Sequence, residues 1–167
     1  EHNGNSDTDV KDAVQPTSAD DPVSHYTDVL KVFAREHGYD IHDVPSDGDC
    51  LFSACAYQLQ SIGRDVVDAS SLRQDVCQFL SRYGAFYSDF VHQSVASSDG
   101  YNADNEPPDE EDAYIESITD PVVQQELRYQ KYVRRLSEGA WGDSIAISAM
   151  CNKFNVNIVV FCANAAG

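Results

Sequence analysis

The chain has 167 residues, 42% of them hydrophobic and 23% charged, and its formal net charge is -17. This length allows one domain with a real core, and the negative charge argues against a nucleic-acid partner. No apolar run is long enough to predict a membrane span, and we expect no metal or other cofactor. The five cysteines are odd in number and contain no Cys-x-x-Cys pair. This pattern favours a reducing compartment, cytoplasmic or nuclear, over a disulfide framework.

The N-terminal part changes character near residue 23. Residues 1–22 are polar with few large apolar side chains, so we interpret them as a disordered lead-in to a domain over residues 23–167. An apolar stripe with helical spacing begins at Ser24, and Gly38 is a reasonable stop. Residues 39–44 alternate weakly and predict a short strand or an extended segment.

The most informative stretch is SDGDCLF, at residues 46–52, a polar turn followed directly by an apolar helix. Cys50 is expected at the start of that helix, where backbone N–H groups point outward and the helix dipole favours negative charge. A thiolate nucleophile needs such a place, because nearby N–H groups can also stabilise an oxyanion. The alternative is that Cys50 is a small buried apolar residue.

The middle of the chain predicts a helix followed by an acidic loop. Ser71 to Gln74 has the pattern of a capping box before an amphipathic helix that ends near Gly84, and a further short helix is expected around Phe90. Residues 97–112 are acidic, rich in Gly and Pro, and predict a mobile surface loop. The loop is either a solvated insertion or a device that steers a basic partner.

Two helices and a strand are predicted in the C-terminal part. Asp120 and Pro121 favour a helix start, and this helix runs to about residue 137. Its basic cluster is interpreted as a solvated face, with a patch for an anionic partner as the alternative; the cluster comprises Arg128, Lys131, Arg134 and Arg135. Residues 144–154 predict a buried helix packed on a sheet, and residues 156–162 a buried strand.

Two blocks carry a resemblance to a known family. The segment DGDCLF, at residues 47–52, resembles the nucleophile signature of the OTU (ovarian tumour) family of papain-like cysteine proteases, which remove ubiquitin from proteins. EGAWGD, at residues 138–143, with the helix and strand after it, resembles the family's second block. The resemblance covers residues 24–162 and implies an α+β fold. Helices would pack around a small central β-sheet, with the C-terminal strands missing.

The resemblance also implies roles for particular residues. Cys50 would be the nucleophile, Asp47 the acid that shapes the site, and the N–H groups of Gly48, Asp49 and Cys50 the oxyanion turn. Asp47 is equally interpreted as an Asx-turn residue, and both roles can hold at once. Trp141 is either a large apolar anchor or a residue bordering the substrate channel. The remaining four cysteines are interpreted as core thiols.

A thiolate enzyme also needs a histidine as general base. In the OTU family that histidine lies beyond the strand that matches residues 156–162. We therefore expect the base to lie outside this chain, and the chain alone to be inactive and less stable than a longer form. None of the five histidines matches the family's position, although His42 is nearest to Cys50 in sequence. Each is interpreted as a surface or hydrogen-bonded residue: His2, His25, His37, His42 and His92.

Two functions of different classes follow from the resemblance. The first is a thiol-dependent deubiquitinase that cleaves isopeptide bonds after the C-terminal glycine of ubiquitin, with ubiquitin or polyubiquitin chains as partners. The second is a catalytically silent module of the same fold that binds ubiquitin or serves as a scaffold. A cysteine protease for another peptide has no positive support in the sequence.

Overall fold

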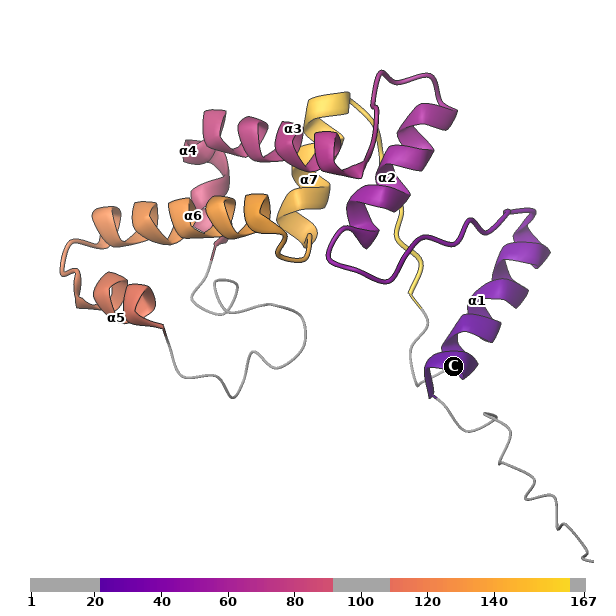
Figure 1. Ribbon diagram of the computed structural model, residues 1–167, viewed down its shortest axis with the longest axis horizontal. Coiled ribbons are helices and arrows are strands. Elements are labelled where there is room, and N and C mark those ends of the chain that lie inside the picture. The colour runs from indigo at the N-terminus through magenta and orange to yellow at the C-terminus, as the bar shows by residue number, and fades with distance from the viewer. Residues whose placement is uncertain (1–21, 92–108, 163–167) are drawn as a thin grey trace, which may run out of the picture. The chain divides into compact units, whose positions relative to one another are not determined.

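The computed structural model describes residues 22–91 and 109–162, which form two compact units. One unit contains residues up to Ile41 and from Val160 onward, and the other contains residues 42–159. The helices, shown in Figure 1, are α1 (Pro22–His37), α2 (Cys50–Ser61), α3 (Ala69–Arg82), α4 (Gly84–Tyr87), the 3-10 helix η1 (Ser88–Phe90), α5 (Glu110–Ser117), α6 (Pro121–Glu138) and α7 (Ser144–Phe154).

The predicted central β-sheet is wrong for the described residues, which contain helices but no strand. Residues 156–162 and 39–44 have no regular secondary structure. The β-branched run beginning at Val156 favours an extended backbone, but a strand also needs a neighbour to pair with its N–H and C=O groups. No such neighbour exists within the described part of the chain. Helix α7 therefore packs on another helix, α3, rather than on a sheet.

The smaller unit is built around the aromatic side chains of α1 and its surroundings. The ring of Phe33 stacks on His37 at a centroid distance of 4.1 Å and contacts the ring of Phe161 at 5.0 Å. Helix α1 ends as predicted at Gly38, whose φ of +72° is the left-handed conformation that favours glycine. The amide of Tyr39 then donates to the Ala34 carbonyl at 2.8 Å, which closes the helix end.

Helix α3 lies at the centre of the larger unit and contacts α2, α6 and α7. Its residues Leu72, Val76 and Leu80 repeat every four positions, so they share one helix face, and all three are fully buried. In Figure 1, α3 and α6 run side by side. The core side chains that meet this face from the other helices include Phe52, Leu59, Leu136, Ala146, Ala149 and Met150.

Aspartates cap several helices of the larger unit. The predicted start of α6 is confirmed, since the Asp120 carboxylate accepts a hydrogen bond from the Val122 amide at 2.9 Å and Pro121 opens the helix. The predicted capping box at Ser71 is wrong. Helix α3 begins at Ala69, before Ser71, and its cap is Asp68. The Ser71 amide donates to the Asp68 carboxylate at 2.7 Å. The hydrogen bonds from Ser71, its amide first, lower the pKa of the Asp68 carboxyl.

Helix α5 was not predicted and overlaps the end of the proposed acidic loop. Residues 97–108 of that loop lie outside the described residues, as do residues 1–21. Asp109 caps α5 by accepting a hydrogen bond from the Asp112 amide at 2.7 Å. Glu110 to Asp112 then form the first turn, where the helix dipole stabilises negatively charged carboxylates.

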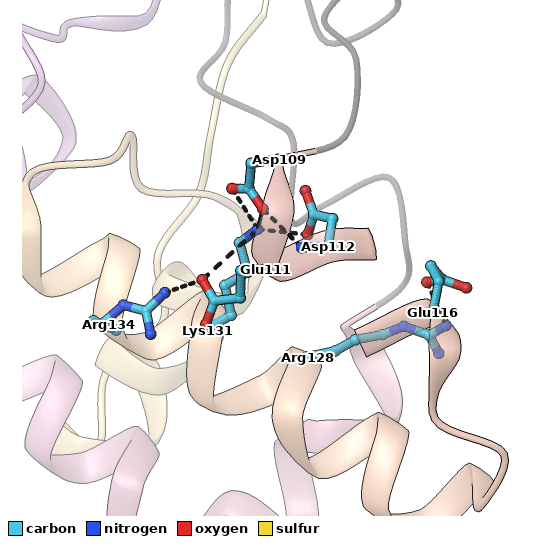
Figure 2. Close-up of polar contacts among 7 residues, drawn as sticks. All are labelled: Asp109, Glu111, Asp112, Glu116, Arg128, Lys131 and Arg134. Carbon is cyan, nitrogen blue, oxygen red and sulfur yellow. Dashed lines mark hydrogen bonds and ion pairs between the residues drawn. The ribbon is translucent and has the colours of Figure 1, made fainter. Parts of the chain in front are cut away.

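Ion pairs join α5 to α6 (Figure 2). Lys131, predicted on a solvated face, is only 1% exposed, and its ammonium lies 2.7 Å from Asp109 and 2.5 Å from Asp112. Arg134 pairs with Glu111 beside it. The interpretation of this cluster as a solvated face is therefore wrong for Lys131, which is buried and whose charge is paired within the chain. Among the described residues, no helix is both long and apolar enough to cross a membrane.

Candidate active site

Cys50 is the first residue of α2 and is half-buried. The turn before it is closed by Asp47, whose side-chain oxygen accepts from the Asp49 amide at 2.9 Å. The Asp47 carbonyl accepts from the Cys50 amide at 3.2 Å. Asp47 therefore forms the predicted Asx turn, and two of the three predicted oxyanion N–H groups donate to it. Its role as the acid that shapes the site, like the oxyanion role of the turn, stays a prediction.

Two glycines allow the nucleophile turn to touch the segment around Trp141. A Cβ atom on Gly48 would lie 2.7 Å from the carbonyl oxygen of Gly139, a backbone atom that cannot rotate away. A Cβ atom on Gly142 would lie 2.5 Å from a methyl carbon of Leu51. The two blocks that the sequence analysis singled out separately, residues 47–52 and 138–143, are therefore in close contact.

The segment after α6 leads to the start of α7, which Asp143 caps. Asp143 accepts hydrogen bonds from the Ile145 and Ala146 amides at 2.9 and 3.0 Å, so it caps α7. The hydroxyl of the buried Tyr132 donates to the same carboxylate at 2.8 Å. Burial, reinforced by the Asp143 charge, raises the pKa of that tyrosine. Trp141 itself is 51% exposed, which leaves its face open but does not assign it to a substrate channel.

Arg73 was not predicted as a site residue, yet its guanidinium joins these segments. Its Nε donates to the Asp49 carboxylate at 2.8 Å, and its Nη2 donates to the Gly48 carbonyl at 2.5 Å. Its Nη1 donates to the carbonyls of Leu136 and Ala140, both at 2.6 Å. Arg73 as a whole is 5% exposed. One signal could have revealed it: a charged residue on the same helix face as Val76 and Leu80 must be paired.

The other cysteines differ in burial. Cys55 and Cys77 are buried as predicted, and burial raises the pKa of each thiol to about 11. Cys151 is half-buried, whereas Cys162 is exposed, so the interpretation of Cys162 as a core thiol is wrong. A raised pKa leaves little thiolate near neutral pH, so Cys55 and Cys77 are poor nucleophiles.

The histidines that the structure describes have other contacts. The ring of His42 stacks on Tyr57 with a centroid distance of 3.7 Å. Tyr57 follows Cys50 by seven residues, which is about 10 Å along a helix axis. In the smaller unit, Nδ1 of His37 lies 2.8 Å from the Phe33 carbonyl oxygen. His2, His92 and the side chain of His25 lie outside the described structure.

A metal centre finds no support in the described part of the chain, where no three His, Cys, Asp or Glu residues are grouped so as to hold an ion. The groups that the described residues place at the site are the Cys50 thiol, the backbone N–H groups of its turn, and the half-exposed Trp141 on the adjoining segment.

A cysteine at the start of a helix, preceded by a glycine turn, is the arrangement that thiol nucleophiles of cysteine proteases use. The model of the family described as OTU-like cysteine protease matches residues 45–167, and the chain belongs to this family. A protein of Tipula iridescent virus, named "Putative ubiquitin thioesterase L96", is 25% identical over 135 residues. That match covers 78% of this chain but only 13% of the viral protein. No solved structure matches the chain.

Proposed function

We propose that this chain carries the nucleophile half of a deubiquitinase site, with Cys50 attacking the isopeptide bond after the C-terminal glycine of ubiquitin. The observation that carries the proposal is the placement of Cys50 at the start of α2, in a turn that contacts the Gly139 segment. Membership of the OTU-like family and the name of the viral relative support ubiquitin as the substrate. Polyubiquitin chains would be bound through the same C-terminal glycine.

The proposed reaction has two steps. The Cys50 thiolate adds to the carbonyl carbon, the carbonyl oxygen takes the electron pair, and N–H groups of the turn stabilise the oxyanion. The C–N bond then breaks, the lysine amine leaves with a proton from the general acid, and a thioester on Cys50 remains. Water hydrolyses the thioester and regenerates the thiol.

The turn must adjust for this chemistry, because the Asp49 amide already donates to the Asp47 carboxylate. That amide becomes available to an oxyanion only when the Asp47 side chain releases it. We propose that a histidine outside this sequence is the general base. The contact described for the His42 ring is consistent with this, since that ring stacks on Tyr57. Trp141, half-exposed beside the turn, is proposed to border the channel for the ubiquitin tail. A reducing compartment, cytoplasmic or nuclear, would keep the thiol active.

The test is incubation with ubiquitin that carries an electrophile at its C-terminus. We expect a covalent adduct in a longer chain that continues past residue 167, and loss of that adduct on Cys50→Ala. Cys162→Ala is the matched control, since it removes an exposed thiol elsewhere and should leave labelling unchanged. Labelling that survives Cys50→Ala would contradict the proposal. Ubiquitin binding without labelling in any form would favour the silent module.

A further inference from the structure

The geometry points to Arg73 as a positioning residue for the nucleophile turn, an inference that rests on the proposed function of Cys50. Arg73 belongs to α3, not to either block of the site, and does not touch Cys50 in any described contact. Its guanidinium instead binds the two segments that must stay aligned for the thiol to meet a substrate. These segments are residues 48–49, just before Cys50, and residues 136–140, just before Trp141.

The first contact fixes the main chain next to the thiol. Nη2 of Arg73 donates to the Gly48 carbonyl at 2.5 Å and lies 2.7 Å from the Asp49 carboxylate. The Asp49 side chain makes no capping hydrogen bond to α2. Its described polar side-chain contact is therefore with Arg73, although a helix N-cap aspartate ordinarily binds the helix amides. The carboxylate is positioned for the guanidinium and not for the helix.

The second contact fixes the end of α6. There the Gly139 amide donates to the Leu136 carbonyl and the Ala140 amide to the Arg135 carbonyl, the pattern of a Schellman motif. Nη1 of Arg73 adds hydrogen bonds to the carbonyls of Leu136 and Ala140. A cation is favourable at this place because carbonyl groups at a helix C-terminus carry partial negative charge.

Arginine suits this task better than lysine. Its planar fork makes four hydrogen bonds in fixed directions, to Asp49, Gly48, Leu136 and Ala140. One face of the fork also lies over the Phe52 ring, with 4.2 Å between the guanidinium carbon and the ring centroid. Phe52 is fully buried in α2, so the guanidinium is tied to the core as well as to both turns.

The close approach of the two segments makes this alignment sensitive. Gly48 meets the Gly139 carbonyl so closely that no side chain fits between them. A small displacement of either segment would move Cys50 relative to the segment that carries Trp141. Misplacement of a reacting group by about 1 Å can cost roughly 100-fold in rate.

Two variants test the inference. Arg73→Lys keeps the charge but loses the fork. Asp49→Ala removes one partner of Arg73, and it opens no core cavity because the Asp49 side chain is 48% exposed. Arg82→Lys is the matched control, an exposed arginine in the last turn of the same helix. Thermal unfolding of each variant identifies any that fails to fold. If Arg73→Lys fails to fold, Asp49→Ala still tests the inference.

The first measurement is hydrogen exchange in peptides covering residues 46–52, 136–142 and 74–80. We expect exchange to rise about tenfold in the first two peptides of both variants, but not in the third, where helix α3 is held by its core. Arg82→Lys should match the unchanged chain. A uniform rise in all three peptides, or no rise at all, would overturn the inference, since Arg73 would then only support the core or do nothing.

The second measurement is the rate at which the longer chain, which continues past residue 167, reacts with electrophilic ubiquitin, separated into binding and chemical steps. We expect about a tenfold slower chemical step with binding changed less than twofold, because misplacement affects the reacting atoms and not the docking surface. A chemical step that is unchanged overturns the inference. If no form reacts with the probe, the proposed function fails, whereas the exchange pattern still decides whether Arg73 holds the turn.

Discussion

Two buried cations stabilise the larger unit in different ways. Arg73 is 5% exposed and Lys131 is 1% exposed, and each lies beside the cap of a helix. Three of the four hydrogen bonds of Arg73 reach backbone carbonyls, so it fixes the path of two turns. The partners of Lys131 are side-chain carboxylates, among which Asp109 is 56% exposed.

The contrast shows what each kind of contact can control. Hydrogen bonds to backbone carbonyls define the position of main-chain atoms, and hence the N–H groups and thiol of the Cys50 turn. A lysine ammonium bound to partly exposed carboxylates defines only that α5 stays on α6. We therefore expect changes at the Arg73 site to alter reactivity, and changes at the Lys131 cluster to alter stability alone.

The largest effect is expected for Gly48→Ala, which disturbs the contact between the two turns that Arg73 binds. The new Cβ would lie 2.7 Å from the Gly139 carbonyl oxygen, so the two turns must separate. In the longer chain that continues past residue 167, we expect the reaction with electrophilic ubiquitin to fall about 100-fold per folded molecule. Overpacking should also lower the free energy of unfolding by about 1–3 kcal/mol.

Gly63→Ala is the matched control at the other end of α2. It meets no atom within 4 Å but has a φ of +75°, so it introduces backbone strain without a clash. We expect lower stability with the reaction unchanged. Reaction of Gly48→Ala at the rate of the unchanged chain would show that contact between the two turns is unimportant for chemistry.

The next effect concerns the Lys131 cluster. In the double variant Asp109→Asn and Asp112→Asn, the amide of residue 109 can still cap α5. Lys131 loses its two nearest counter-charges and keeps only Glu111, whose carboxylate lies 3.9 Å from the ammonium. We expect the free energy of unfolding to fall by about 1–3 kcal/mol, less than for a fully buried pair because the carboxylates are partly exposed.

Urea unfolding followed by circular dichroism measures this change. Lys131→Met is the matched control and should cost less, since it leaves carboxylates that can reach water and no buried charge. The reaction of folded molecules with electrophilic ubiquitin should be unchanged in both variants. A slower reaction there would mean that the cluster also positions the nucleophile turn, and the distinction from Arg73 would be lost.

The sequence predicted local features of this structure well. The apolar stripe of α3, the start of α6 at Asp120 and the placement of Cys50 at the start of α2 are confirmed, because each depends on residues within a few positions of one another. The cap of α3 was misplaced because Asp68 and Ser71 both have side-chain oxygens that can cap a helix. Only the structure shows that Asp68 is the cap, since its carboxylate accepts from the Ser71 amide.

Features that depend on distant partners could not be predicted. The run after Val156 has strand composition, but pairing is a property of two segments, and none pairs with it in the described residues. Helix α5 has little apolar periodicity and is held by ion pairs to α6. The role of Arg73 depends on carbonyls 63 and 67 residues away in sequence, which no local pattern reveals.

A smaller effect is expected from acid. The hydrogen bond from Lys131, and then that from the Asp112 amide, lower the pKa of the Asp109 carboxyl. The unfolded chain therefore takes up this proton first as the pH falls. The stabilisation is complete above the unfolded value of about 3.9 and is lost as the pH falls through the lower folded value. Urea unfolding from pH 6 to pH 3 should show this loss, and Asp109→Asn should have a shallower slope at the acid end.

The smallest effect is expected for Glu111→Gln, on the solvent side of the same cluster. Glu111 pairs with Arg134, but both side chains are well exposed, at 39% and 48%. Exposed pairs contribute about 0–1 kcal/mol and are screened by salt. We expect a loss of about 0.5 kcal/mol at low ionic strength that disappears in concentrated sodium chloride. Glu138→Gln, which removes a 4.0 Å contact with the same arginine, is the control and should cost still less. A loss at Glu111 as large as that of the double aspartate variant would show that the exposed rim, rather than the buried ammonium, holds α5 on α6.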